Sequence, residues 1–204
     1  MWSARQAAAR VCACLALAAN RNNDKIGLVA FGESVVKHVP PKKGAAHVLR
    51  IVRDCLALPG GSTSTDMASA LEFTSRAVRR RAIVFVLSDF LSDGWQDAMA
   101  LCARRHDVVA VRLTSPEIVP PAAGLMRVRD PETGRESVAD WSVPAVRAAY
   151  ARRVAAWRER TETDLRRAKV DLMEVPIPRG PDRNAVANPI VRFFRMREQR
   201  GAKR

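Results

Sequence analysis

The stretch "AIVFVL", residues 82–87, is a run of six apolar residues without polar alternation. A strand that is apolar on both faces is typical of the middle of a parallel sheet that helices cover on both sides. A second strand that is apolar except for Arg112, residues 108–113, follows after a helical pattern at 95–105. This alternation of strand and helix predicts an α/β fold with a doubly wound, mostly parallel sheet.

The same pattern extends toward both ends of the chain. Short apolar runs between turn residues predict strands at 25–31, 34–39 and 170–175, the second of them an edge strand that Pro40 and Pro41 stop. Helical spacing of apolar residues predicts helices at 4–19, 45–57, 66–80, 144–168 and from 188 onward. Turn residues from Asp130 to Gly134 predict an inserted β-hairpin over 124–140. We therefore expect a single domain over residues 1–198 and a basic tail over 199–204.

The chain of 204 residues carries a formal net charge of +14, and most of its cations are arginines. Such a surface favours acidic partners. Exposed arginines leave sequence-independent binding of nucleic acid open, but aromatic residues for base stacking are scarce at 5%. The candidate arginines are Arg76, Arg79, Arg80, Arg81 and those of the tail from Arg192.

The longest apolar run, residues 11–19, is too short for a membrane span and is better explained as part of a buried helix. The four cysteines lie within apolar helical patterns and form no C-x-x-C pair. Both features indicate a cytoplasmic protein with reduced thiols. Cys102 and His106 have a spacing that suits one helix face, but no second pair completes a zinc site.

Hydroxyl groups and a carboxylate gather in the loop "GGSTSTD", residues 60–66. A helix over 66–80 would be about 22 Å long. The strand 82–88, which runs back in the direction opposite to the helix, would be about 23 Å long. Thr65, before the helix, and Asp89, after the strand, therefore reach the same edge of the sheet. This is the carboxyl edge, where open α/β sheets bind ligands. The hard oxygen ligands predict a site for Mg²⁺ or Mn²⁺ at Thr65 and Asp89.

Other interpretations of this loop stay open from the residues alone. Thr65 or Ser64 could be only the N-cap of the helix. The glycines could hold a phosphate, although Asp66 and Asp89 would repel an anion. Asp89 could be a nucleophile, but Leu91 stands where aspartate-based phosphatases carry a second aspartate.

A phosphate-handling enzyme at this edge would also need a general base. The three histidines are His38 on the edge strand, His47 in a helix and His106 just before a strand. None of them is clearly placed beside Thr65 and Asp89. We therefore expect a protein without catalytic residues.

Six segments together resemble the bacterial "domain of unknown function 58" family: "LALAANRNNDKIGLVAF", "PPKKGAAHVLRIVRD", "GGSTSTDMASAL", "IVFVLSDF", "RHDVVAVRLTSP" and "VRDPETGRE". The resemblance is collinear and implies a von Willebrand factor A-like fold. It matches Thr65 with the threonine of the metal-ion-dependent adhesion site, which binds the metal directly. It matches Asp89 with the late aspartate, which acts through water. The family implies a non-enzymatic protein-interaction module that works with MoxR-type AAA+ ATPases in maturing or remodelling other proteins.

The sequence departs from the family pattern at its beginning. The motif Asp-x-Ser-x-Ser, which opens the adhesion site, occurs nowhere in the 204 residues. The first strand, which is central in this fold between the strands at 25–31 and 82–88, is missing as well. Each orphaned backbone group costs about 1–3 kcal/mol, against a total stability of about 5–15 kcal/mol. We expect a marginal or unfolded chain with weak metal affinity, and a start codon placed too late rather than a decayed copy.

Overall fold

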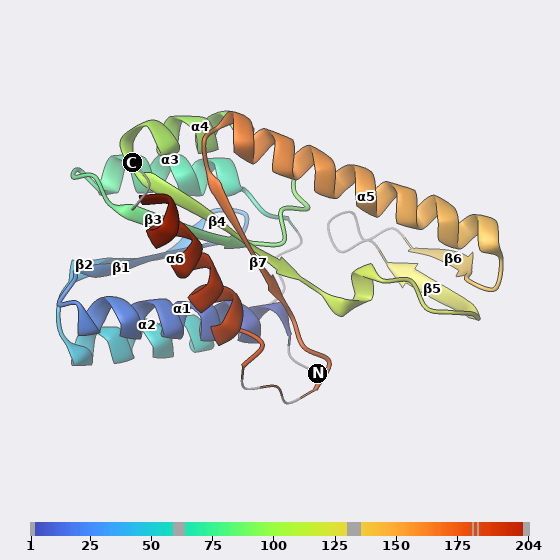
Figure 1. The fold of residues 1–204 in the computed structure, drawn as a ribbon, viewed down its shortest axis with the longest axis horizontal. Helices are drawn as coiled ribbons and strands as arrows, with labels where there is room; N and C mark the ends of the chain where they lie inside the picture. Colours follow the sequence, from blue (N-terminus) through green and yellow to red (C-terminus); the bar gives the residue numbers. More distant parts are fainter. Residues whose placement is uncertain (1–2, 59–63, 130–135, 181, 183, 202–204) are drawn as a thin grey trace.

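The computed structural model describes residues 3–58, 64–129, 136–180, 182 and 184–201 (Figure 1). Its elements are, in chain order, α1 (Ala4–Arg21), β1 (Ile26–Phe31), β2 (Val35–Lys42), α2 (Ala45–Ala57), α3 (Met67–Ala77), β3 (Ile83–Ser88), α4 (Gln96–Arg105), β4 (Asp107–Thr114), the 3₁₀ helix η1 (Pro116–Ile118), β5 (Leu125–Arg129), β6 (Glu136–Asp140), α5 (Pro144–Arg167), β7 (Asp171–Pro176) and α6 (Ala187–Gly201).

A parallel sheet of three strands, in the order β3-β4-β7, forms the centre of the molecule. Its middle strand β4 is buried from Val108 to Leu113 because helices cover both of its faces. The predicted α/β class with parallel strands is therefore confirmed. The strands β1 and β2 pair antiparallel in a sheet of their own, and β5 and β6 form the predicted hairpin.

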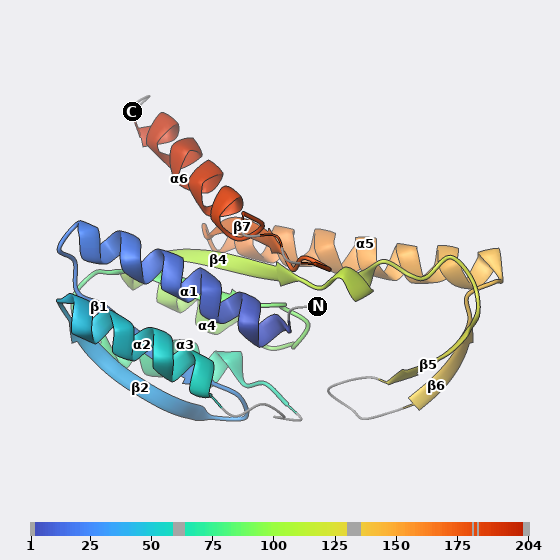
Figure 2. The ribbon, with the colours of Figure 1, turned by 90° about the horizontal axis from the view of Figure 1, so that it is seen from below.

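Successive residues of β4 point to opposite faces of the sheet. Val109, Val111 and Leu113 pack with α1 and α6, whereas Val108 and Ala110 pack with α3, α4 and α5. A third core cluster joins α1 to β2 and α2 through Ala9, Val39, Ile51 and Cys55. The helix α1 thus packs on both the three-stranded sheet and the β1–β2 unit. Figure 2 shows α5 running past the sheet, with the β5–β6 hairpin curving away below it.

Several boundaries differ from the predicted ones. The strand β2 does not stop at the prolines but continues through Pro40 and Pro41 to Lys42. It pairs only with β1, so it is an edge strand in which proline need not donate a ladder hydrogen bond. The helix α3 ends at Ala77 instead of residue 80. The helix α6 extends to Gly201, so the predicted tail begins inside a helix.

The predicted burial of α1 also needs correction. The helix is buried on two sides, through Val11 and Ala9, but it is not buried all round, because Leu17 is 51% exposed. Of the arginines on α6, Arg192 and Arg195 are exposed. Arg197, by contrast, donates to both carboxylate oxygens of Asp107 at 2.8 Å and pairs with Asp171. This arginine docks α6 onto the starts of β4 and β7.

No helix in the described part of the chain is long and apolar enough to cross a membrane.

Candidate metal-binding edge of the sheet

The first turn of α3 is capped by Asp66. Its Oδ1 accepts a hydrogen bond from the Ser69 amide at 2.9 Å, and its Oδ2 accepts one from the Ser69 hydroxyl at 2.6 Å. These bonds hold the pKa of Asp66 below its usual value. The alternative that Thr65 or Ser64 caps the helix is wrong, because Asp66 has this role. The Asp66 amide also donates to the Gly32 carbonyl at 2.8 Å, which ties the start of α3 to the end of β1.

Asp89 lies in a tight turn directly after β3. The Ser88 hydroxyl accepts from the Phe90 amide at 3.0 Å, and Asp89 Oδ1 accepts from the Leu91 amide at 3.1 Å. Phe90 has a positive φ of 60°, a region that bulky residues rarely enter. Such backbone strain costs about 1–3 kcal/mol and persists only where surrounding contacts impose it.

The contacts that hold this turn come from Phe90. Its side chain is 2% exposed and packs edge-on against Trp95, with 5.4 Å between the ring centroids. Its carbonyl accepts a hydrogen bond from Trp157 Nε1 at 3.0 Å. Because α5 and the core fix Phe90 in this way, the preceding carboxylate of Asp89 is left exposed to solvent.

Thr65 lies just before α3, and Asp89 lies just after β3. The start of α3 and the end of β3 lie at the same end of the sheet. Met67 in the first turn of α3 and Val86 in β3 belong to the same core cluster as Phe90. Figure 1 shows that α3 begins at the end of the molecule at which β3 ends. Thr65 and Asp89 are both exposed there.

No direct contact between the side chains of Thr65 and Asp89 is found in the described part of the chain. Within those residues there is also no group of three or more His, Cys, Asp or Glu side chains that could hold a metal ion. Residues 60–63 of the hydroxyl-rich loop lie outside the described residues. The metal-binding roles of Thr65 and Asp89 therefore stay predictions.

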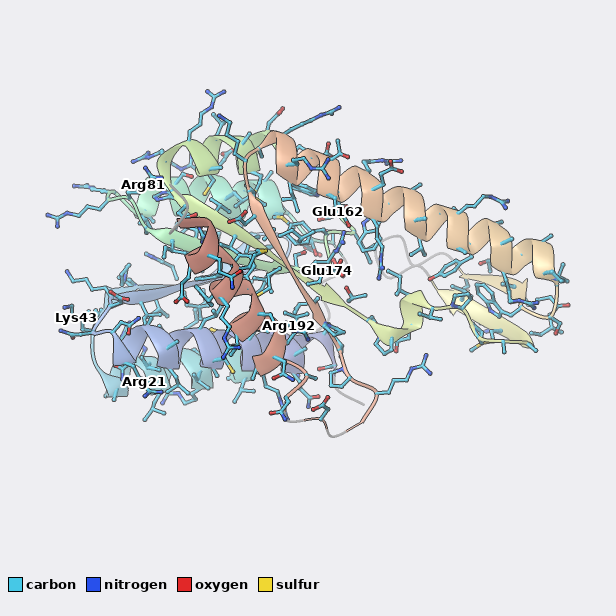
Figure 3. All side chains as sticks on the ribbon, viewed as in Figure 1. Arg21, Lys43, Arg81, Glu162, Glu174 and Arg192 are labelled. Carbon is cyan, nitrogen blue, oxygen red and sulfur yellow. The ribbon has the colours of Figure 1, made fainter. Side chains whose placement is uncertain are left out.

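Sequence reasoning missed one charged group beside this edge. Arg112 is 1% exposed, on the face of β4 that α5 covers. Its Nε donates to Glu174 on β7 at 2.6 Å, and its Nη2 donates to Glu162 on α5 at 2.9 Å. Its guanidinium lies 5.3 Å from the centre of the Trp157 ring. Figure 3 shows Glu162 and Glu174 beside each other on α5 and β7.

Arg112 is also the register partner of Ser88, the last residue of β3. It thus connects β4, β7 and α5 directly behind the turn that carries Asp89. A single arginine within the apolar stretch "VVAVRLT" was the signal that could have revealed it. A charge in a strand buried on both faces requires partners.

The three histidines lie on the elements that the sequence predicted. His38 on β2 packs against Phe73, with 5.1 Å between the ring centroids. His47 on α2 donates through Nε2 to the Ile26 carbonyl at 2.8 Å. His106 is buried at the end of α4, where burial and then the charge of Arg105 lower its pKa.

Three exposed cations lie away from this edge. Arg21, Lys43 and Arg81 are exposed and lie at the end of the molecule at which β3 begins (Figure 3). Arg76 pairs with Glu72 one turn away on α3. The candidate carboxyl edge and these cations are thus at opposite ends of β3.

The fold and the edge define an α/β protein with a parallel sheet and the exposed side chains of Thr65 and Asp89 at its carboxyl edge. Residues 2–160 match the family described as "Protein of unknown function DUF58", and the chain belongs to this family.

Two mycobacterial relatives support this assignment. The chain is 28% identical to uncharacterized protein Rv1480 of Mycobacterium tuberculosis over 97% of its own length and 62% of the relative. It is 30% identical to uncharacterized protein MAV169 of Mycobacterium avium, over 80% of the chain and 95% of the relative. The chain therefore spans about three-fifths of the length of the first relative.

Among solved structures, the chain resembles the conserved hypothetical protein BatB from Bacteroides thetaiotaomicron. The TM-score is 0.53 at 15% identity, over 94% of this chain and 88% of that one. At this level of identity the likeness concerns the fold alone.

Proposed function

We propose that this protein is a non-enzymatic, metal-assisted protein-interaction module of von Willebrand factor A-like fold. Thr65 would bind Mg²⁺ or Mn²⁺ directly, and Asp89 would bind it through water. An open position on the ion would accept a carboxylate from a partner protein. Hard divalent cations prefer such oxygen ligands and retain water readily, so these residue types suit the role.

One observation carries this proposal. The capping of α3 is done by Asp66, and the strained turn at Phe90 is held from behind by Trp157. Thr65 is therefore not needed to cap the helix, and Asp89 uses Oδ1 to hold its own turn through the Leu91 amide. Both residues remain exposed where α3 begins and β3 ends.

The partner we propose is a MoxR-type AAA+ ATPase or a client of that ATPase. We propose that the two proteins interact in the cytoplasm. A net charge of +14 would speed the encounter with an acidic partner, and this effect would weaken as salt is added.

The proposal also includes a further strand between β1 and β3. Within the described residues, β3 pairs only with β4 and β1 pairs only with β2. Yet α1 packs on both sheets, and Ile83 at the start of β3 is 56% exposed despite lying in a fully apolar run. A strand that paired with both edges would cover this residue and supply the Asp-x-Ser-x-Ser motif after it. The coding sequence upstream of Met1 would test this directly, because an in-frame apolar strand ending in that motif is expected.

Metal binding is tested by titrating the chain with Mg²⁺ and Mn²⁺ in a calorimeter. We expect weak binding to the chain as it stands, and affinity lower by about tenfold or more in Thr65→Ala and Asp89→Asn. Thr65→Ser keeps the hydroxyl and should retain binding. Asp24→Asn is the matched control, because it removes an exposed carboxylate between α1 and β1, away from this edge. Equal affinity in all four variants would refute the proposed ligands.

The interaction itself is tested by pull-down with a MoxR-type AAA+ protein, with and without a chelator. The proposal expects capture that decreases when the metal is removed and in Asp89→Asn. Absence of capture under both conditions would defeat the proposed partnership, whatever the metal titration shows.

A further inference from the structure

Two thiols that are far apart in the sequence meet between α1 and α2. The Sγ atoms of Cys12 and Cys55 lie 3.4 Å apart although the residues are separated by 43 positions. All four cysteines of the chain are free thiols in this structure. Cys14 packs instead with the α1–α6 side of the sheet, and Cys102 with the α3–α4 side. Cys12 and Cys55 are therefore the two thiols that the fold brings together.

A hydrogen bond between the two thiols couples their ionisation, while burial and the charge of Asp54 act against ionisation of Cys55. When Cys55 ionises, the thiol of Cys12 donates a hydrogen bond to the thiolate, which lowers the pKa of Cys55 and raises the pKa of Cys12. The thiolate is the form that attacks an oxidant. Cys55 is 7% exposed, whereas Cys12 is half-buried and leaves the pair open to small reagents from one side.

The remaining movement needed for a covalent bond is small. A disulfide has its sulfur atoms about 2.05 Å apart. The two Sγ atoms must therefore approach by little more than 1 Å from their present 3.4 Å. Because α1 and α2 already pack on each other around Ala9 and Ile51, rotation of the side chains and a slight shift of the helices can provide this.

We propose that Cys12 and Cys55 form a redox-modification site at which a peroxide converts the dithiol into a disulfide between α1 and α2. The Cys55 thiolate attacks hydrogen peroxide, and the O–O bond breaks to give a sulfenic acid and hydroxide. The Cys12 sulfur then attacks the Cys55 sulfur, the S–O bond breaks, and water leaves with the Cys12 proton. In total, two thiols and one peroxide yield one disulfide and two waters.

The disulfide would act on α1, one of the helices that connect the two sheets. The helix α1 packs on β4 and β7 through Ala7 and Val11, and on the β1–β2 unit through Ala9. Tying α1 to α2 fixes the β1–β2 unit against the helix that covers the three-stranded sheet. A cross-link over 43 residues also restricts the unfolded chain strongly. Oxidation is therefore expected to stabilise the chain reversibly.

The test is oxidation of the folded chain, residues 1–204, with a small excess of hydrogen peroxide. The count of reactive thiols should fall from four to two, and peptide mapping should find Cys12 linked to Cys55. Dithiothreitol should restore all four thiols. Cys14→Ser and Cys102→Ser should still form the bond, whereas Cys12→Ser and Cys55→Ser should not.

The unfolded chain provides the reference for this experiment. In guanidinium chloride, chain proximity favours a link between Cys12 and Cys14, which are only two positions apart. A Cys12–Cys55 link in native buffer therefore shows that the fold brings the two thiols together. Peptide mapping of disulfides in the chain without substitutions gives this result whether or not any variant folds. A Cys12–Cys14 link in native buffer, or four thiols that persist after oxidation, would overturn the proposal. So would a melting temperature that does not rise on oxidation of the chain.

Discussion

The Asp66 side chain, at the candidate edge, stabilises the fold because it caps the helix α3. Replacement of a capping aspartate by alanine costs about 0.5–2 kcal/mol, and Asp66→Ala should show this cost at neutral pH. The folded-state pKa of Asp66 is lowered by its bonds to Ser69, so the stabilisation is fully present above the usual value of 3.8. This stabilisation is lost as the pH falls through the lowered pKa that Asp66 has in the folded state.

Urea unfolding of the chain and of Asp66→Ala at several pH values measures this effect. The difference in unfolding free energy should be constant above pH 5 or so and shrink in acid, because the cap is charged only above its pKa. Asp66→Asn keeps an acceptor and should lose less stability than the alanine variant. A difference that grows in acid would contradict the assigned cap.

Trp157 is the residue through which α5 acts on the Asp89 turn. Trp157→Phe removes the hydrogen bond to the Phe90 carbonyl and should cost about 1 kcal/mol. Because Phe90 is strained, the turn at 88–91 should also exchange its amide hydrogens faster. Hydrogen exchange read by mass spectrometry measures both effects.

Trp141→Phe is the matched control for that measurement. The Trp141 indole nitrogen is buried without a hydrogen-bond partner in the described structure, so its loss should be neutral or stabilising. Equal exchange at 88–91 in the two variants would show that Trp157 does not hold the turn.

At the scale of elements, the sequence predicted the parts that carry a local signal. Residues 82–87 are apolar on both faces, and this alone predicted the parallel strand β3. The predicted end of β2 was wrong. Pro40 and Pro41 stop a strand only where the amide hydrogen that proline lacks is needed for a ladder hydrogen bond, and an edge strand does not require it.

The contacts of the site were harder to predict because their partners are distant in the sequence. Arg112 pairs with Glu162 and Glu174, which lie 50 and 62 positions further on. Only the folded structure shows which acidic side chains pair with Arg112. The same holds for Cys12 and Cys55. The pairing of Thr65 with Asp89 was predicted by matching a helix over 66–80 with a strand over 82–88, and it stays a prediction.

The edge of β3 gives a prediction for one element. Amides of β4 are held between two strands, whereas β3 has a ladder on one side only in the described structure. Alternate amides of β3 should therefore exchange faster than those of β4. A version of the chain with an added strand between β1 and β3 should slow them. Uniform protection of β3 and β4 in the present chain would mean that the β3 edge is already covered.

At the scale of the whole molecule, cohesion depends on α1 and α3 because no backbone ladder joins the β1–β2 unit to the three-stranded sheet in the described residues. The helix α3 contacts the β1–β2 unit through the Asp66–Gly32 hydrogen bond and the His38–Phe73 pair. We therefore expect two regions that open separately, as in proteins with sub-global unfolding. Ile51 lies in the cluster of the β1–β2 unit, and Met99 lies in the cluster under α3 and α4. Both side chains are fully buried, so truncation to alanine should cost about 2–5 kcal/mol at either place.

The two variants should differ in where this cost falls. Ile51→Ala should raise the hydrogen exchange of β1, β2 and α2 while β4 stays protected. Met99→Ala should raise the exchange of β3, β4 and α4 as well as that of the smaller unit, because α1 loses its support when the main sheet opens. A single cooperative domain would instead show the same increase for every element in both variants. That outcome would mean that packing through α1 and α3 couples the two sheets as firmly as a shared strand would.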